Sequence, residues 1–359
     1  MTSENAVQEE VNEQDESLVI PEDEYQPNAF GLNFGREESE LVLLPVPFDL
    51  TCSYRRGTAT AAKRIIDASH QMDFSNPDLD DFVTAGVFCE KIPADIRAIN
   101  DDFSARARAY TQAYDAGVDI ALEPEFLKTQ HDLNEASKIV YASTYARAEQ
   151  CIEENKIIGL IGGEHSASLG VIDALSDYID SFGVLQIDAH MDLRDGYQGL
   201  THSHATVMRH VLAINDVSRL IQVGVRDYCN EELFFVEDQK GRVKTYFDRD
   251  IHDQLFSGKT WESICKKIVN NCPDKVYISC DIDGLSPSFC PNTGTPVPGG
   301  LTYNQVIFLI RQLVKAKKEI IGFDLVEVNG PEHSVDVITA SHLLYQLCGY
   351  TWLSQEQQQ

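Results

Sequence analysis

The feature that most constrains the fold is a series of short runs of Val, Ile and Leu that are apolar almost throughout. They lie at 40–48, 156–163, 182–190, 219–225, 275–283 and 319–328. Continuous apolar runs of this length indicate strands that are buried on both faces, because a strand with one wet face would alternate with polar residues. Segments with helical spacing lie between the runs, at 134–155, 166–179, 205–214, 261–271 and 303–317. The alternation predicts an α/β fold with helices on both faces of a mainly parallel sheet, joined by right-handed crossovers.

Composition sets the limits of the folded part. Residues 1–40 contain twelve acidic residues and one base, Arg36, so residues 1–24 are expected to be a solvated, disordered tail. No repeat or Gly/Ser linker divides the remainder, which predicts a single domain over 25–350. Residues 351–359 end in SQEQQQ and are expected to be a frayed tail. The charged, weakly periodic residues 91–133 are interpreted as a helical insertion.

Charge and targeting signals narrow the class of partner. A net charge of −28 would repel nucleic acids and anionic membranes and would favour a cationic substrate, although acidity also serves solubility alone. The first residues lack the basic start and apolar stretch of a signal peptide, and no apolar run is long enough to span a membrane. Nine cysteines occur without a C-x-x-C pair, which indicates reduced thiols rather than disulfides or a zinc site. We therefore expect a cytoplasmic protein.

Polar clusters follow four of the predicted strands at their carboxyl ends. Ligands of open α/β folds bind beyond these ends, so the clusters can meet in one crevice. The first cluster is GGEHS, which delivers His165; a lone histidine in this position more often caps a helix or packs than binds a metal. The second is DAHMD, where Asp188, His190 and Asp192 recur at a spacing of two and so point to one side of extended backbone. A solvated strand end is the alternative.

The third cluster, SCDIDG, repeats this spacing with Asp281 and Asp283. Two aspartates on one face of a strand repel each other, and a bound cation would offset that cost. The four aspartates and two histidines form a set without thiolate, which suits Mn²⁺ or a similar divalent ion, and they exceed the needs of one ion. Two ions with bridging carboxylates would activate a shared water for hydrolysis.

The fourth cluster, FDLVEVN, places Glu327 after a strand. A carboxylate there could pair with a planar cation such as guanidinium, whereas Glu327 taken alone favours a structural role.

Together these motifs resemble the signatures of the ureohydrolases, the family of arginases, agmatinases and formiminoglutamases. The matching stretches are GGEHS, IDAHMD, SCDIDGLSPSFCPNTGTPVPGGLT and DLVEVN, and with SYRRGT (53–58) the resemblance runs from about Pro45 to Leu347. It implies an arginase-like, three-layer α/β/α fold around about eight strands, assembly as trimers or hexamers, and a pair of Mn²⁺ ions, with Ni²⁺ or another divalent transition metal as the alternative.

The resemblance also implies roles for single residues. One ion would be held by His165, Asp188, Asp192 and Asp281, and the other by Asp188, His190, Asp281 and Asp283. Asp188 and Asp281 would therefore bridge. Among the catalytic residues, which also include Asp192, His204 matches the histidine that passes a proton to the leaving amine, and Glu327 matches the carboxylate that grips the guanidinium. A hydroxide between the ions would attack the guanidinium carbon to give urea and an amine.

The family pattern is altered at Glu164, Ser286 and Gly330, none of which is a predicted ligand, so orientation of the ligands and substrate fit are what these changes put in question. Substrate motifs are mixed: SHATVMRH resembles agmatinases, TPVPGGLTY resembles arginases and DLR resembles formiminoglutamases. Arg194, if it faces the pocket, would favour a substrate with a carboxylate, and a surface role for it is equally open. Ser203 is a second candidate for substrate contact.

We expect a hydrolase of the arginase or agmatinase type that acts on agmatine or an arginine-like substrate. The alternatives are a formiminoglutamase-like enzyme, a guanidinobutyrase or guanidine hydrolase on the same site, and a non-catalytic partner subunit. A two-metal phosphoesterase shares the metal logic but lacks clustered Lys and Arg near the motifs, apart from Arg194 and Arg226.

Overall fold

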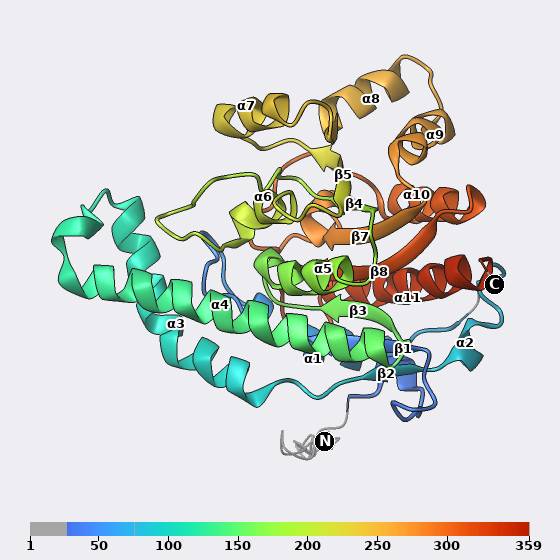
Figure 1. The fold of residues 1–359 in the computed structure, drawn as a ribbon, viewed down its shortest axis with the longest axis horizontal. Coiled ribbons are helices and arrows are strands. Elements are labelled where there is room, and N and C mark those ends of the chain that lie inside the picture. Colours follow the sequence, from blue (N-terminus) through green and yellow to red (C-terminus); the bar gives the residue numbers. More distant parts are fainter. Residues whose placement is uncertain (1–26, 75, 359) are drawn as a thin grey trace, which may run out of the picture.

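One parallel sheet organises the computed structural model, which describes residues 27–74 and 76–358 (Figure 1). Its eight strands lie in the order β2-β1-β3-β8-β7-β4-β5-β6, and every pairing is parallel. The strands are β1 (Leu41–Pro45), β2 (Val87–Cys89), β3 (Ile157–Ile161), β4 (Phe182–Ile187), β5 (Val217–Val225), β6 (Val243–Phe247), β7 (Lys275–Asp281) and β8 (Glu319–Val326). The predicted α/β class is confirmed, and the predicted tail 1–24 lies outside the described residues.

Helices cover both faces of this sheet (Figure 1). They are α1 (Ala61–Ser69), α2 (Phe82–Ala85), α3 (Ala94–Asp115), α4 (Pro124–Glu153), α5 (Leu169–Ser176), α6 (Val207–Val211), α7 (Asn230–Asp238), α8 (Asp248–Phe256), α9 (Trp261–Asn271), α10 (Tyr303–Lys315) and α11 (Val335–Glu356). Short 3-10 turns are η1 (Ala29–Gly31), η2 (Thr58–Thr60), η3 (Ile120–Leu122), η4 (His165–Ser168), η5 (His204–Thr206) and η6 (Ile282–Gly284).

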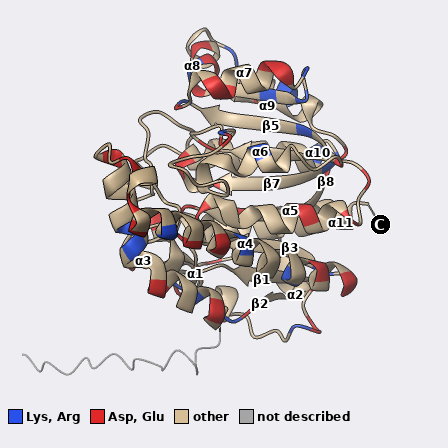
Figure 2. Cartoon of the chain, turned by 60° about the vertical axis from the view of Figure 1, so that its left-hand side comes forward, with Lys and Arg blue, Asp and Glu red and all other residues tan. Residues whose placement is uncertain are grey.

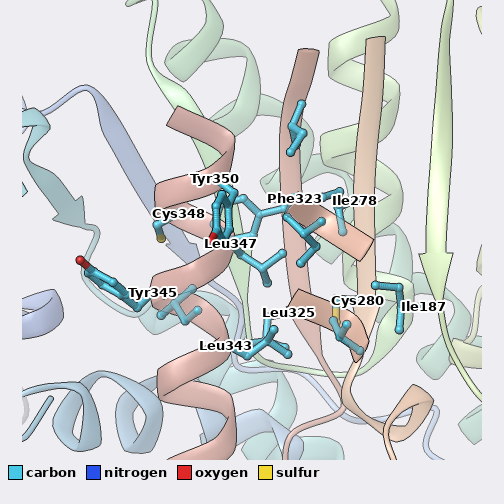
Figure 3. Packing of buried hydrophobic residues seen from close by; sticks show 14 of the residues in the cluster. Ile187, Ile278, Cys280, Phe323, Leu325, Leu343, Tyr345, Leu347, Cys348 and Tyr350 are labelled. Carbon is cyan, nitrogen blue, oxygen red and sulfur yellow. The ribbon is translucent and has the colours of Figure 1, made fainter. Parts of the chain in front are cut away.

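Alternate residues of each central strand enter different cores. Leu41 and Leu43 of β1 pack with α1, α10 and α11, whereas Val42 and Leu44 pack with α3, α4 and α5 on the other face. Figure 3 shows the first core, where α11 lies against β7 and β8. Since both faces are covered, the strands are apolar throughout, and the three-layer architecture expected from the sequence is confirmed.

Some elements differ from the prediction. The edge strands β2 and β6 were not predicted, whereas the helical reading of 91–133 is confirmed by α3 and the first turns of α4. The frayed tail predicted from residue 351 is wrong for the stretch up to Glu356, because α11 continues to that residue. Ser354 is buried there, and its Oγ accepts a hydrogen bond of 2.9 Å from the Ile320 amide of β8.

Within the described ranges, no helix has both the length and the apolar character that crossing a bilayer requires. All nine cysteines are free thiols, and eight of them are buried.

The turn that follows β3 depends on glycine. Gly162 and Gly163 have φ values of 80° and 74°. A Cβ on Gly163 would also lie 2.7 Å from the carbonyl oxygen of Val46 and 2.9 Å from that of Phe48, so no side chain fits. This turn brings His165 to the sheet edge where β3, β8, β7 and β4 lie side by side.

Candidate metal centre and active-site cavity

The six predicted metal ligands meet at the carboxyl edge of the sheet. Nδ1 of His165 lies 2.9 Å from Asp192 Oδ2, 3.2 Å from Asp188 Oδ2 and 3.6 Å from Asp281 Oδ2. Beside this group, Nδ1 of His190 lies 3.1 Å from Asp283 Oδ2 and 3.5 Å from Asp188 Oδ1. Asp188 therefore presents one oxygen to each histidine, as a bridging carboxylate would.

The residues fit divalent cations. Ligand atoms of His165, Asp188 and Asp281 lie within 4.8 Å of one another, and so do those of Asp188, His190 and Asp283. Nδ1 of His165 is buried and has no hydrogen-bond partner, although carboxylate oxygens surround it. A buried polar atom without a partner is rare, and here an ion would supply the missing one. Asp281 belongs to the group around His165 and not to the group around His190.

The backbone fixes the carboxylates. The Asp283 amide donates to Asp281 Oδ1 at 2.8 Å, the His190 amide donates to Asp188 Oδ1 at 2.6 Å, and the Ala189 amide donates to Asp283 Oδ1 at 3.0 Å. These bonds restrain each side chain before any ion arrives. Preorganisation of this kind lowers the entropic cost of binding.

A buried relay orients His165. Its Nε2 lies 2.8 Å from the Ser279 hydroxyl, which donates to Asp324 Oδ2 at 2.8 Å. Asp324 in turn accepts the Cys280 amide at 2.9 Å. Since the Ser279 proton points to Asp324, its oxygen accepts from Nε2–H, and this tautomer leaves Nδ1 free as a ligand.

Burial and mutual repulsion make it unfavourable for the clustered carboxylates to be charged unless cations are bound. Burial, then the charge of Asp188, raises the pKa of Asp192 to about 7. Burial, followed by Asp283 and Asp188, raises the pKa of Asp281 well above its usual value. Burial alone would lower the pKa of His165, but Asp188 and Asp192 raise it. The ion-free cluster therefore holds protons that divalent ions would replace.

A cavity of about 250 Å³ opens above the cluster. It is lined by Ser53, Tyr54, His190, Asp192, Arg194, Tyr197, His204, Ala205, Asp227, Glu232, Thr295, Pro296 and Val297. Arg194 thus faces the cavity, and its guanidinium carbon lies 4.7 Å from the centre of the Tyr197 ring. Two predicted ligands, His190 and Asp192, form part of the wall, so a bound molecule could contact the metal centre.

His204 also lines this cavity, at the start of η5. Its Nε2 lies 3.2 Å from the Ser53 hydroxyl, while its Nδ1 is buried without a partner. Burial, then the charges of His190 and His165, lowers the pKa of His204 to about 3. The imidazole is therefore neutral at pH 7 and has a nitrogen that can accept a proton.

Among the residues predicted for catalysis or substrate contact, Ser203 and Glu327 do not line the cavity. Ser203 is buried beneath it, where its amide donates to Thr206 Oγ1 at 2.9 Å and helps to begin η5. Glu327 is buried behind His165, and its Oε1 accepts the His165 amide at 2.9 Å. Ser203 therefore supports the His204 loop rather than the cavity wall, and Glu327 lies next to the ligands.

The cavity contains residues that sequence reasoning missed. Tyr197, Asp227, Glu232 and Thr295 come from loops and a helix start, where no apolar pattern marks them. Asp227 lies two residues after the end of β5, so the rule about polar residues at strand ends could have found it.

Glu164, which departs from the family pattern, is fully buried. It accepts bonds from the Thr51 amide at 2.8 Å and from Ser166 Oγ at 2.6 Å. The longer side chain therefore ties the segment before Ser53 to the turn that carries His165.

Comparisons with known proteins agree on one family. The sequence model of the Arginase family matches residues 39–349. An N(1)-aminopropylagmatine ureohydrolase of Synechocystis is 27% identical over 326 residues, covering 89% of this chain and 91% of the relative. An agmatinase of Pyrococcus horikoshii is 34% identical over 190 residues, covering 53% of this chain and 61% of the relative.

Solved structures show the same fold. The agmatine ureohydrolase of Thermoplasma volcanium superposes with a TM-score of 0.69 at 24% identity, covering 93% of this chain and 96% of the other. An arginase from Bacillus cereus gives 0.63 at 18% identity, covering 88% and 98%. Because the family match spans most of the chain and the expected enzyme class agrees with it, this protein belongs to the arginase family of hydrolases.

Proposed function

We propose that the chain hydrolyses a guanidino C–N bond with two divalent ions, Mn²⁺ first among the candidates and Ni²⁺ second, and releases urea and an amine. His165, Asp188, Asp192 and Asp281 would hold one ion, and His190 and Asp283, with Asp188 and Asp281 shared, the other. Such a pair supplies Lewis-acid activation of water near neutral pH. The observation that carries the proposal is Nδ1 of His165, which has no hydrogen-bond partner although three carboxylates surround it.

The chain's own residues would bind the substrate and move its protons. Glu327 accepts one hydrogen bond, at Oε1, which leaves Oε2 for a guanidinium N–H. His204, whose Nδ1 has no hydrogen-bond partner, would carry a proton to the leaving amine. The Ser53 hydroxyl beside Nε2 would hold the imidazole in place during that transfer.

The charge of the cavity favours a substrate whose far end is cationic. Asp192, Asp227 and Glu232 line it together with one base, Arg194. Asp227 stands at the rim, where its side chain is 67% exposed. A primary or secondary amine beyond the guanidinium would meet this carboxylate, as in agmatine or N(1)-aminopropylagmatine, which the names of several relatives carry. We therefore place polyamine-type guanidines ahead of arginine.

Urea release tests the proposal. Purified protein loaded with Mn²⁺, and Ni²⁺ in parallel, is assayed with agmatine, N(1)-aminopropylagmatine, arginine, guanidinobutyrate and guanidine. We expect the first two to give the highest kcat/KM. The Asp188→Ala variant should be inactive, while Asp195→Ala, in an exposed residue that pairs with Arg209, should match the wild type. No urea from any substrate, with metal content verified, would contradict the proposal.

The rim carboxylate allows a sharper test of the substrate class. Asp227→Asn should raise KM for agmatine about 2- to 5-fold, the scale of an exposed ion pair, and leave KM for guanidine unchanged because guanidine has no distal amine. An equal change in KM for agmatine and for guanidine would show that Asp227 does not bind the distal amine of the substrate.

Arg194 supports the second candidate, a formiminoglutamase-like or guanidinobutyrase activity, because it could bind a substrate carboxylate. Formamide release from formiminoglutamate, measured beside the urea panel, separates the two. If formiminoglutamate is the substrate, Arg194→Gln should abolish its turnover. If agmatine is the substrate, the same variant should hydrolyse agmatine as the wild type does. A chain that binds metal and turns over none of these compounds would instead be a non-catalytic partner subunit.

The proposal includes assembly as a trimer or hexamer. Leu122, Phe234 and Phe256 are large apolar residues that are 75%, 64% and 83% exposed, and such residues favour contact with a second copy. Light scattering after size exclusion measures the mass, and a monomer at micromolar concentration would overturn this part alone.

A further inference from the structure

A second cavity lies beside the first and is distinct from it. Its volume is about 820 Å³, and its walls come from the segment after β1, from α1 and α3, and from loops around residues 291 and 330. Ser53 and Tyr54 line both cavities, so this short segment separates them. The size is within the range of small-molecule sites in proteins.

The second cavity is lined mainly by basic residues, although the chain as a whole is acidic. The protein has 57 acidic and 29 basic residues, and Figure 2 shows acidic residues spread over its outer helices. Four of the basic residues nevertheless line this cavity, namely Arg55, Arg56, Arg64 and Arg108, against the single carboxylate of Asp115. Asp115 is already bonded, since Gln198 Nε2 donates to its Oδ1 at 2.9 Å.

Three of these arginines have no carboxylate partner among the described residues. Arg55 donates to the carbonyl oxygen of Pro291 at 2.8 Å and Arg64 to that of Gly330 at 2.5 Å, so each guanidinium keeps its full charge. Arg108 is exposed on α3 and makes no ion pair with any residue that the structure describes. Neutral carbonyls fix the direction of a guanidinium without compensating it.

The fourth arginine, Arg56, lacks one of the hydrogen bonds that its guanidinium group could donate. The side chain of Arg56 is 8% exposed, and one of its terminal nitrogens contacts Asp49 Oδ1 at 2.7 Å. Its Nε is buried without a hydrogen-bond partner. A buried N–H of a charged group that lacks an acceptor is costly, so Arg56, which lines the cavity, is a guanidinium whose hydrogen-bonding capacity is not fully used.

We propose that the cavity binds a small organic anion with two or more negative charges, held by Arg55, Arg64 and Arg108 around the buried Arg56. Guanidinium groups recognise phosphate and carboxylate alike through paired N–H donors. The net charge of −28 does not prevent this, because salt screens surface charges beyond about 8 Å in physiological conditions whereas the arginines act at contact distance. The proposal does not depend on the proposed catalysis.

Calorimetric titration of the full-length protein tests the site, at constant ionic strength. Glycerol 3-phosphate and succinate are the two probes, since they carry the same charge on a phosphate monoester and a dicarboxylate. We expect saturable binding of at least one, with a Kd below about 1 mM, and the tighter probe identifies the source. No saturable binding of either up to about 10 mM overturns the proposal.

Single variants locate the binding. Arg108→Gln and Arg64→Gln should each weaken it at least about tenfold, the scale of one charge-assisted hydrogen bond. Arg249→Gln removes the same charge from an exposed arginine on α8 outside the cavity and should leave Kd unchanged. Arg108→Gln should keep the wild-type melting temperature within a few degrees, because Arg108 is exposed. Unchanged binding in both, or equal weakening in Arg249→Gln, would mean that the anion binds elsewhere.

Discussion

Replacement of Ser279 by alanine tests the relay that orients His165. The Ser279 hydroxyl is fully buried and lies 2.8 Å from both His165 Nε2 and Asp324 Oδ2. Its loss leaves a buried N–H and a buried carboxylate oxygen without a partner, at about 1–3 kcal/mol of unfolding free energy. It also frees the tautomer of His165, so we expect metal affinity to fall about 10- to 100-fold, the usual effect of losing a residue behind a ligand.

The assay is competition for Mn²⁺ with a fluorescent chelator, together with kcat at saturating metal. Weakened binding with kcat recovered at high Mn²⁺ is the expected result. Ser354→Ala is the matched control, because Ser354 is equally buried and bonds the Ile320 amide at 2.9 Å and the Thr351 carbonyl at 2.7 Å, far from the ligands in sequence and on α11. It should lower stability alone. Metal affinity that stays at the wild-type value in Ser279→Ala would refute the relay.

Three further results are expected. Asp281→Ala should lose metal, measured by elemental analysis, and with it turnover, because a buried carboxylate of the His165 group is removed. His204→Ala should keep its metal and lower kcat by about 10²–10⁴-fold in the urea assay, and metal loss there would show that His204 is a ligand. Since the pKa of Asp192 is raised to about 7, its proton must leave when metal binds, so affinity for Mn²⁺ should rise by about tenfold per pH unit for each proton released between pH 6 and pH 7, and flat chelator titrations would contradict this.

The sequence predicted those parts of the fold whose pattern is local. The runs that became β3, β4, β7 and β8 are apolar because both faces are covered, and the polar residues that follow them had no place in a core. This is why spacing predicted that these polar side chains would meet at one edge of the sheet, whereas the division of the candidate ligands between two ions came from the resemblance to the ureohydrolases. Edge strand β2 has three residues and β6, VKTYF, is partly exposed, so neither carried that pattern.

Other features depend on contacts between distant segments. The helix α11 was not among the predicted helices, and its end was expected to be frayed because residues 354–359 are polar in sequence, yet Ser354 is buried against β8. The cavity wall was missed for a similar reason, since Tyr197 and Glu232 reach it from loop and helix positions that no periodicity marks. The arginine-lined cavity joins Arg55 to Arg108 only in the folded chain.

The backbone at two carboxylates of the candidate site has a consequence for the evolution of this chain. Asp192 and Glu327 have φ values of 56° and 58°, in the left-handed region where glycine alone is unstrained. Each such residue costs the fold about 1 kcal/mol or more. Selection for heat resistance alone would favour glycine at both positions, and under the proposed function that change would remove one metal ligand and the carboxylate that binds the guanidinium.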